Sequence, residues 1–164
     1  MIAVFRTLRQ NHALEHATIH VLTEYGCPPL MGHSEYDGFS LYGNLPTEIV
    51  SRAVQEAFSR LQRGETRLAE HPRCGTQFVT QAMLFAGALS FAMTPHYPPK
   101  KTHWIKAAIA IGVAGLLSRA TGRLVQRHIT TDHTLKGLTL GAITCYKRGG
   151  LRVHRIQTLP GGMG

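Results

Sequence analysis

Residues 78–94 read FVTQAMLFAGALSFAMT, a run of seventeen residues without a charged side chain. A second apolar run, WIKAAIAIGVAGLLS, fills residues 104–118 and contains a single cation, Lys106. A helix that crosses a bilayer needs about 20 mainly apolar residues, so both runs approach spanning length. Lys106 is compatible with such a helix because its long side chain can reach the interface beside Trp104.

The two runs are predicted to pack against each other. Small residues in both, including Gly87 and Gly112, allow two helices to approach closely. We therefore expect residues 78–118 to form a membrane-inserted helical hairpin, followed by a basic helix at the cytoplasmic headgroups. The alternative is a helical hairpin buried in a soluble core, since apolar runs of this length also fit a protein interior.

Charge is divided unevenly along the chain. Residues 1–77 hold seven arginines and eight acidic residues, whereas residues 78–164 hold eleven lysines and arginines and one acid, Asp132. This asymmetry favours an anionic partner, which we expect to be the headgroups of membrane lipids. Nucleic acid is a weaker alternative, because the basic half contains the apolar hairpin and lacks aromatic residues interleaved on its strands.

The cysteines indicate the compartment. Three cysteines lie far apart in the chain, and this odd number predicts no disulfide framework. Together with the basic residues, this favours a membrane protein whose soluble part faces the reducing cytoplasm.

Upstream of the apolar runs, residues 12–16 read H-A-L-E-H, the pattern H-x-x-E-H, in a segment predicted to be helical. Residues four apart share one face of a helix, so His12, His16 and His20 form a row with Glu15 beside it. Two imidazoles at this spacing can hold one Zn²⁺, and a neighbouring carboxylate can act as a general base toward water. Glu15 is the candidate catalytic residue.

A catalytic zinc ion needs a third protein ligand and an open position. The leading source is the turn HPRCG at residues 71–75, in which Cys74 offers a thiolate and His71 a further imidazole. His20 is the rival third ligand, although three histidines spread over two turns of one straight helix reach a single ion with difficulty. His20 then serves as an orienting group behind the ligands.

Shorter elements are expected to complete the domain. They are a strand at 38–43, a helix from 46 to about 64, a strand at 67–70, and two C-terminal strands, 142–148 and 151–156, joined by Gly149 and Gly150. Alternation in the last strand predicts that Leu151 and Val153 face the core, while Arg152 and His154 face out, toward water, phosphate or lipid.

The predicted fold class is therefore α+β. A small mixed domain is interrupted by an apolar, membrane-inserted hairpin. The N-terminal half of the domain covers residues 1–77 and carries the H-x-x-E-H helix. The hairpin covers residues 78–118, and residues 119–164 supply a basic helix and the C-terminal β-hairpin.

Two stretches, NHALEHATIHVL at residues 11–22 and HPRCGT at residues 71–76, resemble an uncharacterised family of small bacterial membrane proteins. The resemblance extends over most of the chain, including the apolar hairpin, and implies membrane association and a shared motif. Residues 12–16 alone are similar to the inverted zinc metallopeptidases. Those enzymes take a further Glu ligand from a helix well downstream; Glu70 has a compatible spacing but a different local context.

Two functions follow from these features. The first is a membrane-anchored zinc-dependent hydrolase, most simply a peptidase, with His12, His16 and Cys74 as ligands and Glu15 as general base. The second is a non-catalytic, metal-stabilised subunit or accessory factor of a membrane complex, in which four protein ligands close the site. Partner subunits are then expected in addition to lipid.

Overall fold

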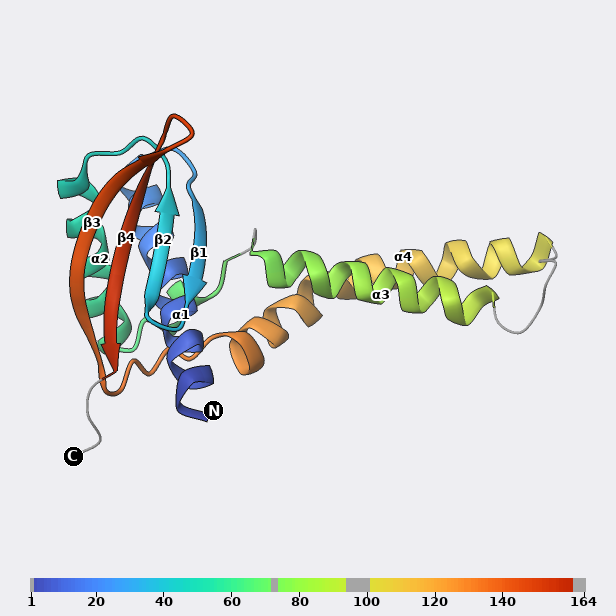
Figure 1. The fold of residues 1–164 in the computed structure, drawn as a ribbon. Helices are drawn as coiled ribbons and strands as arrows, with labels where there is room; N and C mark the ends of the chain where they lie inside the picture. Colours follow the sequence, from blue (N-terminus) through green and yellow to red (C-terminus); the bar gives the residue numbers. More distant parts are fainter. Residues whose placement is uncertain (1, 72–73, 94–100, 161–164) are drawn as a thin grey trace. The chain divides into compact units, whose positions relative to one another are not determined.

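A computed structural model describes residues 2–71, 74–93 and 101–160 of the 164-residue chain. The chain divides into two compact units, Met1–His71 with Thr130–Gly164, and Pro72–Ile129. The first is a mixed α and β unit with an antiparallel sheet, and the second contains two long apolar helices (Figure 1). The predicted fold class, α+β with an inserted apolar helical pair, is confirmed.

The first unit is built on a four-stranded antiparallel sheet. Its strands are β1 (Met31–Glu35), β2 (Gly38–Tyr42), β3 (Leu138–Arg148) and β4 (Leu151–Pro160), in the spatial order β1-β2-β4-β3. The predicted turn at Gly149 and Gly150 joins β3 to β4, and both glycines have positive φ, as a tight two-residue turn requires. Because β4 pairs with β2, the C-terminal hairpin completes a sheet begun before the apolar helices.

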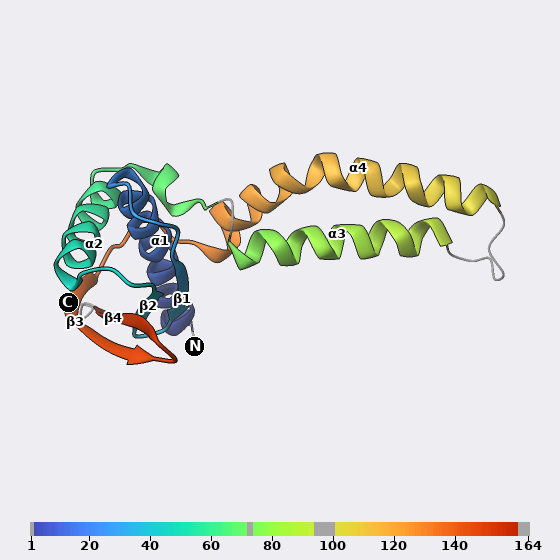
Figure 2. The same cartoon turned by 90° about the horizontal axis from the view of Figure 1, so that it is seen from above.

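Two helices cover one face of this sheet (Figure 2). They are α1 (Ile2–Glu24), which runs without glycine or proline, and α2 (Thr47–Gln62), whose apolar residues recur at helical spacing. Together with the inner face of the sheet they enclose the core. Its fully buried members include Leu14, Leu22, Phe39, Leu41, Val50, Val54 and Ile156.

Two local predictions were wrong. Residues Thr66–Ala69 form a 3₁₀ turn, η1, in place of the expected strand at 67–70. His154, predicted to face out, is buried opposite the core residue Leu41, and Leu151, predicted to face the core, is exposed, although Val153 is buried. Alternation alone did not identify the face toward the helices, because each face of this strand carries both apolar and polar residues.

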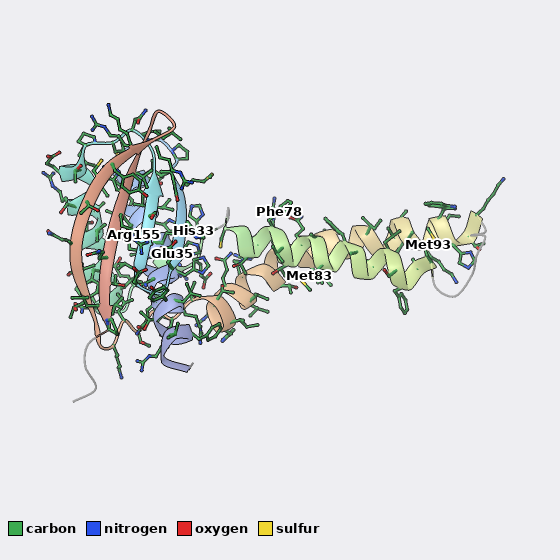
Figure 3. The ribbon with its side chains drawn as sticks, viewed as in Figure 1. His33, Glu35, Phe78, Met83, Met93 and Arg155 are labelled. Carbon is green, nitrogen blue, oxygen red and sulfur yellow. The ribbon has the colours of Figure 1, made fainter. Side chains whose placement is uncertain are left out.

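The second unit contains α3 (Gly75–Met93) and α4 (Lys101–Val125), which lie side by side (Figures 1 and 2). Small residues of α4, including Ala114 and Gly122, are buried in this pair, and the Gln77 amide donates to the Ser118 carbonyl at 3.2 Å. By length and composition both helices suffice to cross a membrane. Large apolar side chains such as Phe78 and Met83 project outward from them (Figure 3).

Candidate metal centre

The histidine row of α1 has the geometry that the motif predicts. His16 is buried and His12 is half-buried, and their ring centroids lie 4.3 Å apart in an edge-to-face arrangement. A ligand-forming atom of each ring lies within 4.8 Å of one on the other. Two nitrogen ligands of a tetrahedral zinc ion are about 3.4 Å apart, so a small rotation of the rings brings both onto one ion.

Hydrogen bonds to backbone carbonyls fix the tautomer of both rings. Nδ1 of His12 lies 3.0 Å from the Thr130 carbonyl oxygen, and Nδ1 of His16 lies 2.7 Å from that of Ala69. A carbonyl oxygen only accepts, so each Nδ1 carries the hydrogen and donates it. In a neutral imidazole Nε2 is then the basic nitrogen. This is the arrangement found in metal-binding histidines, whose second nitrogen donates to a carbonyl or carboxylate.

His20 and His71 flank the same row. His20 donates from Nε2 to the Glu70 carbonyl at 2.7 Å. The His71 ring lies 5.6 Å from the ring of His16 and 5.3 Å from that of His20, measured between centroids. Within the described part of the chain neither joins the group of candidate ligand atoms around His12 and His16. Glu70 contributes its backbone carbonyl to His20.

The row contacts both segments that border the second unit. Ala69 and Glu70, which accept from His16 and His20, precede it in the chain. Thr130, which accepts from His12, follows it. The later segment is fastened further by Arg9, whose guanidinium donates to the Thr131 carbonyl and whose own carbonyl accepts from the Asp132 amide. One face of α1 therefore holds the chain before and after the apolar helices.

Glu15 faces a different element. Its carboxylate accepts a hydrogen bond from the Ser34 hydroxyl on β1. It also lies against Gly32, where an added Cβ would come within 2.0 Å of Oε1. The side chain is 6% exposed, and among the described residues it is not part of the candidate ligand group. Glu15 thus joins α1 to the edge strand of the sheet.

Asn11 is a structural residue that the motif analysis did not single out. Its side chain is fully buried, donates to the Glu35 carbonyl at 2.8 Å and accepts from the Thr158 hydroxyl at 2.7 Å. These bonds tie α1 to β1 and to the end of β4. The only sequence signal was a polar residue beside His12 in the motif, which does not reveal partners 24 and 147 positions away.

Cys74 lies near the start of the second unit. It directly precedes α3, its thiol is half-buried, and its sulfur accepts from the Thr76 amide at 3.4 Å. Amide groups in the first turn of a helix stabilise a thiolate, which is the form that binds metal. Cys74 follows His71 by three residues, so the chain keeps their Cα atoms within about 11 Å of each other.

Three side chains of the first unit have pKa values that their surroundings shift, His154, Tyr25 and Arg60. Burial, and secondarily the charge of Arg152, lowers the pKa of His154. A hydrogen bond from the Tyr25 hydroxyl to the Glu56 carboxylate raises the pKa of Tyr25. Hydrogen bonds to Glu24 and then Glu65 raise the pKa of Arg60.

His33, Glu35 and Arg155, labelled in Figure 3, lie on the sheet. Arg155 forms an ion pair with Glu35 at 2.9 Å.

Comparison with known proteins gives a family without an assigned activity. Residues 7–143 match the family described as "Domain of unknown function (DUF6391)". An uncharacterized protein of Picosynechococcus sp. is 37% identical over 136 residues, which cover 76% of this chain and 65% of that relative. The chain thus spans less than two thirds of the relative's length. No solved structure matches this chain.

Proposed function

This chain belongs to the DUF6391 family of unknown function, and we propose that it is a membrane-anchored zinc-binding protein whose metal site is structural. His12, His16 and Cys74 hold the ion in this proposal, and His71 closes the site as the fourth ligand. The ion then fastens α1 to the segments that lead into and out of the apolar helices. The protein acts as a metal-stabilised accessory factor of a bacterial membrane complex.

The observation that carries the proposal is the pair of carbonyl-bonded imidazoles. His12 and His16 each donate from Nδ1 to a backbone oxygen, which aligns the ring and leaves Nε2 as the basic nitrogen. Rings held in this way lose little conformational freedom when they bind a metal. A histidine that only fills space in a core needs no second histidine beside it. Here two histidines in the same tautomer have ligand atoms within 4.8 Å of each other.

Chain connectivity supports Cys74 as the third ligand. The His71 ring lies 5.6 Å from the His16 ring, and Cys74 follows His71 by three residues. A short tether keeps the thiol near the histidine pair however the second unit is placed. Two imidazoles, a thiolate and a further imidazole form a set that zinc accepts in closed, structural sites.

The position of Glu15 favours a structural role over catalysis. A general base must reach the water that it activates, directly or through one further water. Glu15 instead accepts from Ser34 and packs against Gly32 on β1. Its contacts hold the sheet to α1 beside the metal ligands.

The apolar helices provide the membrane anchor in this proposal. Apolar side chains cover α3 and α4 on all sides, and many of them are exposed, including Phe91 and Leu116 at 84% each. Helices of this kind are stable in hydrocarbon and costly in water. The cations that follow the second apolar run support a cytoplasmic location for the first unit in this proposal.

Metal analysis tests the site. Protein purified in mild detergent should contain one zinc ion per chain, and X-ray absorption should report three nitrogen ligands and one sulfur ligand. His16→Ala should lose the metal and unfold at lower temperature, because binding and folding are coupled. His33→Ala is the matched control, since His33 is an exposed histidine of β1. A metal-free wild type that folds normally contradicts the proposal.

A zinc-dependent hydrolase, most simply a peptidase, is the second candidate. The observation that favours it is a buried carboxylate, Glu15, next to a buried histidine in the H-x-x-E-H pattern. If Glu15 is a general base, Glu15→Gln should retain metal and fold but reduce peptide hydrolysis by about 10²- to 10⁴-fold. If Glu15 is structural, the same change should lower stability, and wild type should show no turnover with four protein ligands on the metal.

Extraction tests the anchor. The chain expressed in bacteria should stay in the membrane fraction after washing with high salt and alkaline carbonate, since these remove electrostatic adhesion but not inserted helices. Recovery of the whole protein as a soluble monomer under these conditions contradicts insertion.

A further inference from the structure

The second unit and its flanks contain cations without carboxylates. Between Glu70 and Asp132 the sequence has no aspartate or glutamate, yet it holds seven lysines and arginines. The cations of the first unit are different, since several form ion pairs. Arg60 pairs with Glu24 and Glu65, and Arg155 pairs with Glu35. The cations of α4 must therefore find their counter-charges outside this unit.

Three of these cations form a ladder over the end of α4 and the π-helical turn η2 (Gln126–Thr130), which continues the helix. Arg119 and Arg123 lie on α4, four residues apart and therefore on one side of it, and Arg127 follows after four more residues in η2. All three are exposed, and within the described residues none forms an ion pair. Leu116, at the apolar end of the ladder, is 84% exposed, so an apolar surface passes directly into a basic one.

The ladder begins where a bilayer's hydrocarbon would end. The helical rise from Lys101 to Arg119 is about 27 Å, close to the roughly 30 Å of a hydrocarbon core. From Arg119 to Arg127 the helix rises by a further 12 Å or so, which spans a headgroup layer roughly 5–8 Å deep. With the apolar segment inserted, Arg119 enters the headgroup layer from the hydrocarbon side, and the long side chains of Arg123 and Arg127 can reach the lipid phosphates from the water side.

We propose that Arg119, Arg123 and Arg127 form a binding site for anionic phospholipid headgroups. The inference rests on the membrane insertion proposed above and names the lipid class that surrounds the anchor. Each guanidinium offers a planar set of donors that matches a phosphate oxygen pair. The absence of carboxylates from this unit means that lipid phosphates meet no competing intramolecular partner there.

The test uses full-length protein reconstituted into two kinds of vesicle, one of phosphatidylcholine and one of phosphatidylcholine with 30 mol% phosphatidylglycerol. Trp104 is the chain's single tryptophan and is 60% exposed on α4. Phosphatidylcholine brominated in its acyl chains should quench Trp104 fluorescence if the helices are inserted. This readout does not depend on the arginines, so it reports the anchor separately.

Headgroup selectivity is then measured with spin-labelled lipids. Wild type should hold spin-labelled phosphatidylglycerol in preference to phosphatidylcholine, with a contribution of up to about fivefold for each cation near the surface. The R119Q/R123Q/R127Q variant should lose most of this preference while Trp104 quenching is unchanged. The matched control, K136Q/K147Q/R148Q, removes three exposed cations from the first unit and should retain the preference for phosphatidylglycerol.

Each other result has a definite meaning. No quenching of Trp104 overturns the anchor, and with it the function proposed above. Quenching with equal retention of both lipids overturns the headgroup site alone. Equal loss in both triple variants shows a general effect of net charge and also overturns the site. Binding of an RNA oligonucleotide that depends on the three arginines, without lipid preference, assigns the ladder to nucleic acid instead.

Discussion

Leu14 and Leu116 show how differently the two units use the same side chain. Leu14 is fully buried in α1, whereas Leu116 is 84% exposed on α4. In the first unit the apolar residues of α1, α2 and the sheet pack against one another and form a buried core. In the second unit apolar residues surround the helices, and the two spanning windows are only 6% and 17% buried.

This difference indicates that the two units are suited to different surroundings. A helix with one apolar stripe can complete its burial against other elements of the same chain. Two helices that are apolar on every side cannot bury all of their apolar surface against each other, because each covers only one side of its partner. Two helices of this kind are held together by close packing and interhelical hydrogen bonds, such as that from Gln77 to Ser118.

The largest expected effect comes from removing one leucine in each unit. Leu14→Ala should lower the stability of the first unit by about 2–5 kcal/mol, because it leaves a cavity in a close-packed core. Leu116→Ala should change stability by less than about 0.5 kcal/mol, because an exposed side chain leaves no cavity. Hydrogen exchange of peptides from α1 and α4 in detergent measures both. Equal losses of amide protection from hydrogen exchange in the two variants would contradict this difference between the two units.

Local sequence pattern predicted most of the architecture. The long helices follow from periodicity or from uninterrupted apolar runs, and the β3–β4 turn follows from Gly149 and Gly150. The histidine row also follows from spacing alone, since positions four apart on one helix must be neighbours. These features depend on residues close in sequence.

The rest depends on contacts between distant residues. The β1 strand was not predicted, because the segment MGHSE lacks a strong β pattern and is held by pairing with β2 and by Glu15. The carbonyl partners of His12 and His16, on Thr130 and Ala69, lie 118 and 53 positions away. Spacing placed Glu15 beside the histidines but could not show that its carboxylate turns to Ser34.

Two glycines provide a smaller test of the same contrast. Gly32→Ala in β1 should destabilise the first unit by about 1–3 kcal/mol, since its Cβ displaces the Glu15 carboxylate and breaks a buried hydrogen bond. Gly87→Ala in α3 meets no atom within 4 Å and should stabilise that helix by up to about 1 kcal/mol. Thermal unfolding in detergent, followed by circular dichroism, measures both signs. Destabilisation by Gly87→Ala would show that α3 is tightly covered there.

The smallest expected effect is a pH dependence confined to the first unit. His154 is buried on the helix-covered face of β4, and neither ring nitrogen has a hydrogen-bond partner within the described residues. Burial lowers its pKa below the ordinary value of 6.5, so the unfolded chain takes up a proton at a pH where the folded chain does not. Stability should therefore fall as the pH drops through 6.5 toward the folded pKa, by at most about 1.4 kcal/mol per pH unit.

His154→Leu isolates this contribution, because leucine cannot titrate and suits a position opposite Leu41. Wild type should therefore lose stability more steeply than His154→Leu as the pH falls. Thermal unfolding of the two proteins between pH 5 and pH 8 gives the difference curve. That curve should be flat above pH 7.5 and slope below 6.5, because only there do the folded and unfolded chains differ in protons bound to His154. Parallel curves across the whole range would show that His154 is protonated equally in both states, and that burial in this core does not exclude the charged ring.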